Sequence, residues 1–486
     1  MCVVGQPPAG CRPRLSRLVC KAVPPTQSNR TYLLVSLGCP KNLVDSECMA
    51  GLLRLEGYEM VGEEERADFA LVNTCGFIAD ARAESYGVIE EMLERKRCGA
   101  LRAVIVAGCL AERNREALLS RYPEIDQVVG VFAREEIAVA VSRVLEGRDE
   151  HRAVFLPPPS RPLADEGRLR ITSPHVGYLK IAEGCDRRCA FCTIPQIRGH
   201  YASKPIEHVV AEARALADDG VRELVVIAQD TSYYGRDLYG APRLADLLAE
   251  LDATEGLAWI RLMYLYPHDV TDRLIERIAR ARRVLPYLDL PLQHASDRLL
   301  RRMRRGVTRA ETERLLGRLR RGIDGLVLRT TLMTGFPGET DAEFEELLDF
   351  VRRERFERLG VFVFSPEPGT PAAEMQGAVP PQVARARRER LMAAQQEIAF
   401  AYNRAQVGRR RDVLIDGPVP GQAHAYLGRT VADAPEIDAA VYVTGEGLVP
   451  GQIVPVEIVE SRGYDLIGVA RSPEKGSELF FGEIAH

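Results

Sequence analysis

Three short hydrophobic runs, each followed by a helical pattern, dominate the first part of the chain. The runs cover residues 32–37, 68–73 and 102–107, and each leads into a turn that contains a glycine and a cysteine. Continuous hydrophobic runs of this length indicate strands that are buried on both faces, and their alternation with helices is typical of parallel sheets. We therefore predict a doubly wound parallel α/β domain over residues 31–150.

A second series of alternating strands and helices follows a proline-rich segment. Residues 151–170 contain Pro157, Pro158 and Pro159, and this composition predicts a stiff linker. Six strand candidates come next, and a long helix near residues 380–405 closes the series. Residues 171–401 are therefore predicted to form a partial (βα)6 barrel, with the active groups at the carboxyl ends of its strands. The strand candidates are residues 177–183, 223–228, 259–266, 287–292, 326–333 and 359–364.

From about residue 402 the pattern changes to short alternating strands separated by glycine and proline turns. Residues 412–415, 439–443 and 453–459 are the clearest of these strands. They predict a small β-barrel over residues 402–471, similar to oligonucleotide-binding folds. Residues 1–30 are rich in Pro, Arg and Ser, and we predict a disordered extension there and a tail at 472–486. We assign no role to the cysteines in the extension, which are Cys2, Cys11 and Cys20.

The composition is that of a globular protein with metal or redox chemistry. The 486 residues are 46% hydrophobic and 28% charged, with a net charge of −4, so nothing in the overall charge favours nucleic acid. The chain contains no apolar run of about 20 residues and no signal-peptide pattern, so we expect no membrane insertion. Eleven cysteines outside a small secreted framework indicate metal or redox chemistry in a reducing compartment, and we expect the cytoplasm.

Three closely spaced cysteines follow the first strand of the predicted barrel. Cys185, Cys189 and Cys192 have C-x3-C-x2-C spacing, with Phe191 directly before the last cysteine. Three thiolates on one loop can hold three irons of a cubane cluster and leave the fourth iron open to a small molecule. A zinc knuckle or a disulfide cluster are the alternatives, although a structural zinc site normally needs a fourth ligand, and no fourth Cys or His lies close by.

A second set of cysteines lies at the strand ends of the first domain. Cys39, Cys75 and Cys109 each follow one of the three predicted strands, at the edge where ligands bind in a doubly wound sheet. They could hold a second cluster, or they could simply fill tight strand-to-helix turns, as small buried cysteines often do. Cys48 and Cys98 lie in or at the end of helical stretches, and we predict packing roles for both.

Polar residues also follow the other barrel strands, and each of them could instead cap a helix or form an ion pair. Arg329 could bind a cofactor carboxylate, because its planar fork matches that group. The dense basic helix after His294 is either a solvated face or a contact for ribosomal or RNA phosphate. The candidates are Gln229 and Asp230, Gln293 and His294, Arg329, Glu339 in the turn of residues 334–339, and the arginines Arg298, Arg301, Arg302, Arg304 and Arg305.

The predicted C-terminal barrel is acidic. Residues 412–470 contain nine Asp and Glu residues against two arginines. Nucleic-acid binding needs a basic surface, so this module would repel phosphate and would suit a basic protein partner better.

Several segments resemble the methylthiotransferase family of radical S-adenosylmethionine (AdoMet) enzymes. Residues 36–47 (SLGCPKNLVDSE), 73–77 (NTCGF) and 108–109 are similar to the family's N-terminal domain, the Cys185–Cys192 motif matches its radical AdoMet domain, and residues 402–471 look like its TRAM domain. Residues 39–45, 287–294 (YLDLPLQH), 428–430 and 433–438 resemble the RimO-type branch. That branch modifies an aspartate of the small-subunit ribosomal protein numbered twelve.

The resemblance implies two 4Fe–4S clusters and AdoMet. Cys39, Cys75 and Cys109 would ligate one cluster, and Cys185, Cys189 and Cys192 the other. The open iron of the radical cluster would chelate the amino and carboxylate groups of AdoMet, with Phe191 near the adenine. From their places on the barrel strands and turns we predict Gln229, Arg329 and Glu339 as further cofactor contacts. A radical would remove hydrogen from the β-carbon of the aspartate, and sulfur would dock at the second cluster.

Two other functions stay open at the level of the sequence. One is the sister MiaB-type enzyme, which acts on an adenosine of transfer RNA and typically has Gln-Met-Asn in place of Pro40, Lys41 and Asn42. The other is a non-catalytic iron–sulfur sensor or ribosome-binding factor. The sequence names neither the electron donor nor the sulfur donor.

Overall fold

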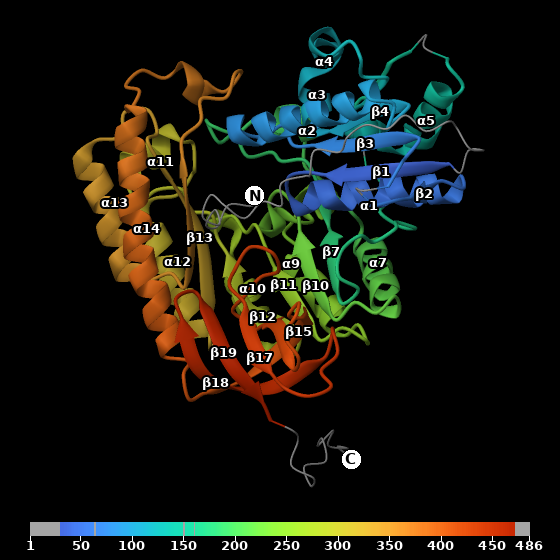
Figure 1. The fold of residues 1–486 in the computed structure, drawn as a ribbon. Helices are drawn as coiled ribbons and strands as arrows, with labels where there is room; N and C mark the ends of the chain where they lie inside the picture. Colours follow the sequence, from blue (N-terminus) through green and yellow to red (C-terminus); the bar gives the residue numbers. More distant parts are fainter. Residues whose placement is uncertain (1–29, 63–64, 149–150, 160, 472–486) are drawn as a thin grey trace.

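The computed structural model describes residues 30–62, 65–148, 151–159 and 161–471. It contains three units: an N-terminal α/β domain, a middle partial barrel and a small C-terminal barrel (Figure 1). The predicted fold class is confirmed. The predicted extension, apart from Arg30, and the predicted tail lie outside the described residues, as do Cys2, Cys11 and Cys20.

The N-terminal domain has one parallel six-stranded sheet in the order β2-β1-β3-β4-β5-β6. Helices α1 and α5 pack on one face, and α2, α3 and α4 pack on the other, so that each face has its own hydrophobic core. The sequence predicted β1, β3 and β4 but not the short strands. The elements are β1 Thr31–Ser36, α1 Pro40–Leu55, β2 Glu59–Met60, β3 Phe69–Thr74, α2 Ala79–Arg97, β4 Ala103–Gly108, α3 Cys109–Asn114, α4 Glu116–Arg121, β5 Gln127–Val129, α5 Ile137–Leu145 and β6 Ala153–Val154.

The middle domain is an open parallel sheet of six strands in the order β14-β13-β12-β11-β10-β7. Strand β11 is shorter than predicted, because the chain turns at Tyr264, whose φ is +62°. The elements are β7 Val176–Lys180, β8 Ala182–Glu183, α6 Ile194–Arg198, β9 Ala202–Ser203, α7 Ile206–Asp218, β10 Glu223–Ile227, α8 Arg236–Tyr239, α9 Leu244–Asp252, β11 Trp259–Leu262, α10 Asp272–Arg280, β12 Val284–Asp289, α11 Asp297–Arg302, α12 Arg309–Gly322, β13 Val327–Thr334, α13 Asp341–Glu354, β14 Arg358–Val363 and α14 Pro381–Arg404.

The helices of the middle domain cover the outside of its sheet, and α12, α13 and α14 line one flank of the molecule (Figure 1). The large apolar core lies between these helices and the strands. A second core fills the inside of the partial barrel, where side chains of the strands meet Val44 and Cys48 of α1 and Ala432 and Ala434 of the C-terminal unit. The barrel interior is therefore closed by both neighbouring units.

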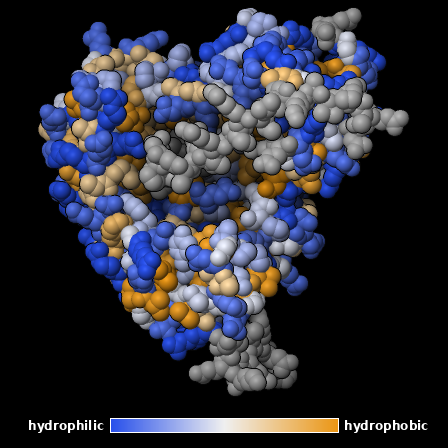
Figure 2. Space-filling model, viewed as in Figure 1, coloured by the Kyte–Doolittle hydropathy of each residue, from blue (hydrophilic) through white to orange (hydrophobic). Residues whose placement is uncertain are grey.

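The C-terminal unit is a closed five-stranded barrel in the order β15-β16-β17-β19-β18. The sequence predicted three of its strands and missed β16 and β19. The strands are β15 Arg410–Pro418, β16 Ala425–Arg429, β17 Val441–Thr444, β18 Ile453–Arg462 and β19 Asp465–Ala470. Hydrophilic residues predominate on the face shown in Figure 2, with some hydrophobic patches over this barrel. The large hydrophobic side chains that the barrel exposes include Tyr442, Val459 and Val469.

The loop between β16 and β17 joins the C-terminal barrel to the middle domain through buried polar contacts. Arg358 donates to Asp433 at 2.5 Å, and Tyr287 donates to Asp438 at 2.6 Å. Next to the loop, Asp416 on β15 contacts His175 of the middle domain at 2.9 Å. Three of the nine acids counted in the sequence are thus turned toward the middle domain rather than toward solvent.

Candidate functional site

The cysteines of the C-x3-C-x2-C motif lie on a tight loop after β8. The loop begins at Gly184, whose φ is +72° and where a Cβ atom would lie only 2.0 Å from the carbonyl oxygen of His200. The amide of Cys185 donates to Gly199 at 3.1 Å, and the amide of Ala190 donates to Met303 at 2.9 Å. The loop is therefore fixed at both ends by the backbone of its neighbours.

Each sulfur atom of this loop accepts one N–H hydrogen bond. Backbone amides donate to Cys185 Sγ (from Arg187, 3.4 Å) and to Cys192 Sγ (from Ile194, 3.5 Å). Cys189 Sγ instead accepts from the guanidinium of Arg305 at 3.4 Å. Such donors stabilise a thiolate, which is the form that binds metal.

Burial opposes the ionisation of these thiols in the metal-free chain. It raises the pKa of Cys185 to about 12 and raises that of Cys192 as well. Because metal ligation requires the thiolate, binding a metal centre here must release protons.

The three cysteines of the N-terminal domain lie on adjoining loops at one edge of the sheet. Cys39 is the N-cap of α1, Cys75 follows β3, and Cys109 begins α3. A Cβ atom on Gly38 would lie 2.9 Å from Cys75 Cβ, and one on Gly76 would lie 2.6 Å from the carbonyl oxygen of Cys109. Glycine is thus required at both contacts for the loops to approach one another.

Asn42 on α1 connects all three of these loops. Its amide nitrogen donates to the carbonyl oxygens of Leu37 (2.7 Å) and Thr74 (3.2 Å), and Cys109 Sγ lies 3.8 Å from its Oδ1.

The thiols of these cysteines differ in the charges that surround them. Burial raises the pKa of Cys109 to about 12, whereas at Cys39 the charges of Lys41 and Arg198 and the backbone amide of Asn42 oppose the effect of burial on the pKa.

Arg198, which the sequence analysis did not single out, links the two sets of cysteines. It lies on α6, the short helix that directly follows the Cys185–Cys192 loop, and its side chain is buried. Its Nε and Nη2 each lie 3.3 Å from Cys109 Sγ, and Nη2 also donates to Asn42 Oδ1 at 3.1 Å. A residue of the barrel therefore hydrogen-bonds a predicted ligand of the other domain.

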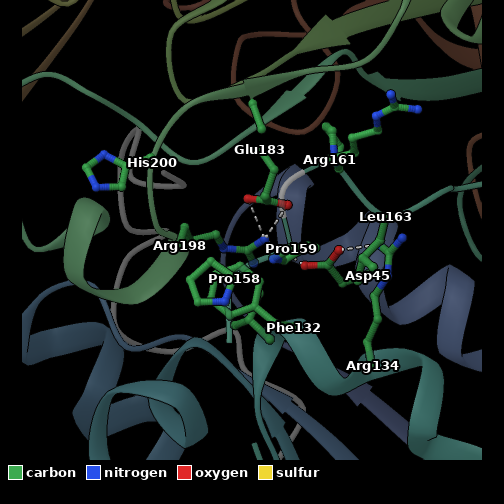
Figure 3. Close-up of a pocket in the computed structure, with 13 residues that line it drawn as sticks. Asp45, Phe132, Arg134, Pro158, Pro159, Arg161, Leu163, Glu183, Arg198 and His200 are labelled. Carbon is green, nitrogen blue, oxygen red and sulfur yellow. Dashed lines mark hydrogen bonds and ion pairs between the residues drawn. The ribbon is translucent and has the colours of Figure 1, made fainter. Parts of the chain in front are cut away.

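Arg198 is also part of a buried ion network between the two domains. Asp45 on α1 accepts ion pairs from Arg134 and Lys180, both at 2.7 Å, and from Arg198 at 2.8 Å. Glu183 pairs with Arg198 at 3.2 Å from the other side. Figure 3 shows this cluster at a pocket where Asp45, Arg134, Glu183 and Arg198 point toward one another. The hydrophobic pattern of the sequence does not predict this ion network, because its members meet only after the domains dock.

The side chains at both triads suit iron–sulfur clusters. Within the described part of the chain, no three His, Cys, Asp or Glu side chains converge closely enough to hold a single metal ion. A cubane, however, places its protein thiolates on separate irons, so they need not meet at one point. Three thiolates without carboxylates form a soft ligand set, which fits iron–sulfur rather than Mg²⁺ or Ca²⁺.

Phe191 lies within the radical-motif loop, and Gln229 follows β10 next to Glu183. Phe191 packs against the hydrophobic cluster that includes Met333 and Phe336. The Gln229 amide donates to Glu183 at 3.2 Å, while its buried Oε1 has no hydrogen-bond partner among the described residues. A bound ligand with an N–H donor would satisfy this unpartnered acceptor at the end of the strand.

Arg329 and Glu339, the other two predicted cofactor contacts, already have protein partners. Arg329 donates to Asp289 at 2.9 Å. Glu339 is buried and pairs with Arg387 at 2.9 Å. Their cofactor roles stay predictions.

The predicted basic helix is shorter than expected, because α11 ends at Arg302 and the chain turns at Arg304, whose φ is +57°. Its arginines have different surroundings. Arg298 is partly exposed and pairs with Glu343, whereas Arg305 is buried against Cys189. Cys48 is buried, as its packing role requires, and Cys98 is half-buried at the end of α2.

Comparisons with known proteins agree with the three units. A model of the radical SAM superfamily matches residues 179–351, an uncharacterized protein family, UPF0004, matches residues 31–130, and a TRAM domain model matches residues 407–470.

The chain is also similar over nearly its whole length to curated relatives. It is 48% identical over 450 residues to "Ribosomal protein uS12 methylthiotransferase RimO" of Anaeromyxobacter sp. (strain Fw109-5), which covers 92% of this chain and 95% of the relative. A relative of the same name from Pelotomaculum thermopropionicum is 48% identical over 438 residues, covering 90% of this chain and 98% of the relative. The chain belongs to the RimO family of methylthiotransferases. It is therefore a radical AdoMet enzyme of the sulfur-transferring class, as its sequence motifs predict.

A solved structure supports the fold of this RimO-family enzyme. The radical S-adenosylmethionine methyltransferase TsrM from Kitasatospora setae, solved with cobalamin and a [4Fe–4S] cluster, matches with a TM-score of 0.52 and 16% identity over 80% of this chain and 82% of that chain. At that identity the likeness concerns the fold alone. No described helix has the length and hydrophobicity needed to span a membrane.

Proposed function

We propose that this enzyme inserts a methylthio group at the β-carbon of an aspartate in ribosomal protein uS12, in the cytoplasm, with two [4Fe–4S] clusters. The observation that carries the proposal is the pair of cysteine triads, one in each domain, with Arg198 of the helix after the Cys185–Cys192 loop hydrogen-bonded across the domain boundary to Cys109. The proposed ligands are Cys185, Cys189 and Cys192 for the radical cluster and Cys39, Cys75 and Cys109 for the second cluster.

The protein side chains have defined parts in this proposal. When bound, the radical cluster supplies the electron that cleaves AdoMet and generates a radical able to remove hydrogen from an unactivated carbon. Phe191 offers an apolar surface for the adenine, and the free Oε1 of Gln229 offers an acceptor to a cofactor N–H group. Cys109, Cys185 and Cys189 are buried and Cys39, Cys75 and Cys192 are half-buried, so the surrounding protein restricts the access of water to these reactive groups.

The C-terminal barrel supports a protein rather than a nucleic-acid substrate. Five of its acids lie away from the contacts with the middle domain described above. These acids are Asp412, Glu446, Glu457, Glu460 and Asp465. Two of them pair with arginines of the same unit, Glu457 with Arg471 and Glu460 with Arg462, and the remaining negative charge would attract a basic protein and repel phosphate. We therefore propose the TRAM unit as the docking site for uS12 rather than for transfer RNA.

The experiment combines iron analysis with product mass. Anaerobically reconstituted wild type is compared with two triple variants, Cys39/Cys75/Cys109→Ala and Cys185/Cys189/Cys192→Ala. Each variant is expected to lose about half of the iron and sulfide, since each triad would hold one cube. The first variant should still cleave AdoMet but should transfer no methylthio group to a uS12 peptide, and the second should do neither.

Either of two results would refute the proposal. Full iron content in the Cys39/Cys75/Cys109→Ala variant would show that these cysteines hold no second cluster. Unmodified uS12 after turnover by a fully loaded wild type, together with a modified nucleoside in transfer RNA, would exclude the substrate.

A further inference from the structure

Lys41 is a buried cation at the interface between the N-terminal domain and the barrel. It lies on α1 two residues after Cys39, and only 7% of the residue is exposed. Its ammonium sits 3.2 Å from the centroid of the Tyr264 ring, which belongs to the turn after β11. The side chain of Lys41 therefore reaches from a predicted cluster ligand to the carboxyl ends of the barrel strands.

No described carboxylate pairs with this ammonium. Its electrostatic neighbours are Cys39, Arg198, Asp289 and Glu183, but no described group lies within ion-pair or hydrogen-bond distance of Lys41 Nζ. The two carboxylates are already engaged, because Asp289 accepts from Arg329 at 2.9 Å and Glu183 accepts from Lys180 at 3.0 Å.

A buried ammonium without a counter-ion among the described residues is costly. Burying a charge without a counter-ion is strongly unfavourable, and an aromatic ring compensates only in part. The other buried lysines of the interface show the usual solution, since Lys180 and Lys204 each contact carboxylates at 2.7 Å. Among the described residues Lys41 has no such carboxylate partner, and the Tyr264 ring that its ammonium contacts lies just after β11, at the carboxyl end of a barrel strand.

We propose that the ammonium of Lys41 binds the carboxylate of the substrate aspartate. This inference rests on the proposed function. The β-carbon of aspartate is bonded directly to the carboxylate carbon, so a carboxylate held at Lys41 brings the reacting carbon beside Cys39 and its cluster. Lys41 then selects an acidic side chain over a neutral one at the target position.

The carboxylate of AdoMet has the same chemistry, and the test separates the two sources. Holoenzyme without reductant is titrated with uS12 peptides that carry Asp or Asn at the target position, and separately with AdoMet. Lys41→Met keeps the length of the side chain and removes its charge, Lys41→Arg keeps the charge, and Lys96→Met removes a lysine that pairs with Asp126 on the far side of the domain. Iron content and the melting temperature establish that each variant folds and loads.

The wild type is expected to bind the Asp peptide about tenfold or more tightly than the Asn peptide, as a charge-assisted contact requires. Lys41→Met should lose this preference while keeping its affinity for AdoMet. Lys41→Arg should retain part of the preference, and Lys96→Met should retain all of it. In turnover, the loss in Lys41→Met should fall mainly on KM for the peptide.

Three results would overturn the assignment. The first is that Lys41→Met still prefers the Asp peptide. The second is that Lys41→Met binds AdoMet more weakly but keeps the preference for the Asp peptide. The third is that the wild type does not distinguish the two peptides. The last result leaves the proposed function standing if the wild type still adds methylthio to the Asp peptide. A wild type that binds the Asp peptide selectively but never modifies it would instead refute the proposed function alone.

Discussion

Arg198 shows how a single buried residue acquires its role from its surroundings. Its guanidinium contacts Cys109 Sγ through two nitrogen atoms at 3.3 Å and also pairs with Asp45 and Glu183. A cation that hydrogen-bonds a cluster thiolate favours the more negative, reduced state of the cluster. We expect Arg198 to position Cys109 and to raise the reduction potential of the proposed second cluster.

Replacing Arg198 with Gln should lower that reduction potential. It should also destabilise the protein by about 3 kcal/mol. This is the low end of the cost of breaking a buried ion pair, because Asp45 keeps two other cations, Arg134 and Lys180. The potential is measured by an EPR redox titration in the Cys185/Cys189/Cys192→Ala background, where only the second cluster would remain. Arg198→Lys should give a smaller shift, since it keeps the charge but loses the planar fork. An unchanged potential in Arg198→Gln would show that the role of Arg198 is only structural.

At the scale of elements, the turns after the strands of the N-terminal sheet bring its three cysteines together. Parallel strands end at the same edge, so each βα turn delivers one cysteine to that edge. The final approach depends on backbone contact, because Gly76 has no room for a Cβ atom beside the carbonyl group of Cys109. The sheet sets the direction of the cysteines, and the glycine sets their spacing.

Gly76→Ala should reduce the iron bound by the second triad while leaving the radical triad loaded. The added methyl group would lie 2.6 Å from the carbonyl oxygen of Cys109 and must push the loops apart. Iron and sulfide analysis in the background without the radical triad measures the loss at the second triad, and the same analysis in the Cys39/Cys75/Cys109→Ala background measures the loading of the radical triad. Gly87→Ala is the matched control, since nothing lies within 4 Å of the added atom in α2, and helix propensity predicts a stabilisation of about 0.5–1 kcal/mol. Equal iron in the two variants would contradict the spacing role of Gly76.

At the scale of the whole molecule, the C-terminal barrel closes the interior of the middle domain. The loop of residues 430–438 carries Asp433 and Asp438 to buried partners on the barrel strands, and Arg261 donates to the carbonyl oxygen of Val431 at 2.9 Å. On the other side, Glu367 of the middle domain pairs with Arg113 of the N-terminal domain at 2.9 Å. Buried ion pairs of this kind fix the register in which the units dock.

Asp433→Asn should loosen the docking of the C-terminal barrel. The substitution leaves the buried Arg358 guanidinium without its charged partner, at a cost of about 3 kcal/mol. Hydrogen–deuterium exchange should become faster in residues 430–438 and on β14, and the melting temperature should fall. Glu460→Gln removes an exposed pair with Arg462 within the same unit and should change neither quantity. If exchange at the loop matches that of wild type, then the ion pair does not hold the units together.

The sequence by itself determined the strand and helix order and the six candidate cluster ligands. Buried parallel strands and the helices between them have distinct hydrophobic periods, which are local properties of the chain. Because the carboxyl ends of parallel strands share one edge, the topology alone brought Cys39, Cys75 and Cys109 together. Short or weakly patterned strands such as β2, β16 and β19 were missed, because too few residues carry a period.

Only the tertiary structure decided which polar residues meet across the domain boundaries. Arg198 reaches Cys109, Lys41 faces Tyr264, and Asp433 pairs with Arg358, in each case from a different unit of the chain. A single charged residue has no period, and its partner lies far away in the sequence. The burial that makes such a charge consequential exists only once the units have docked, so no local pattern could have revealed these contacts.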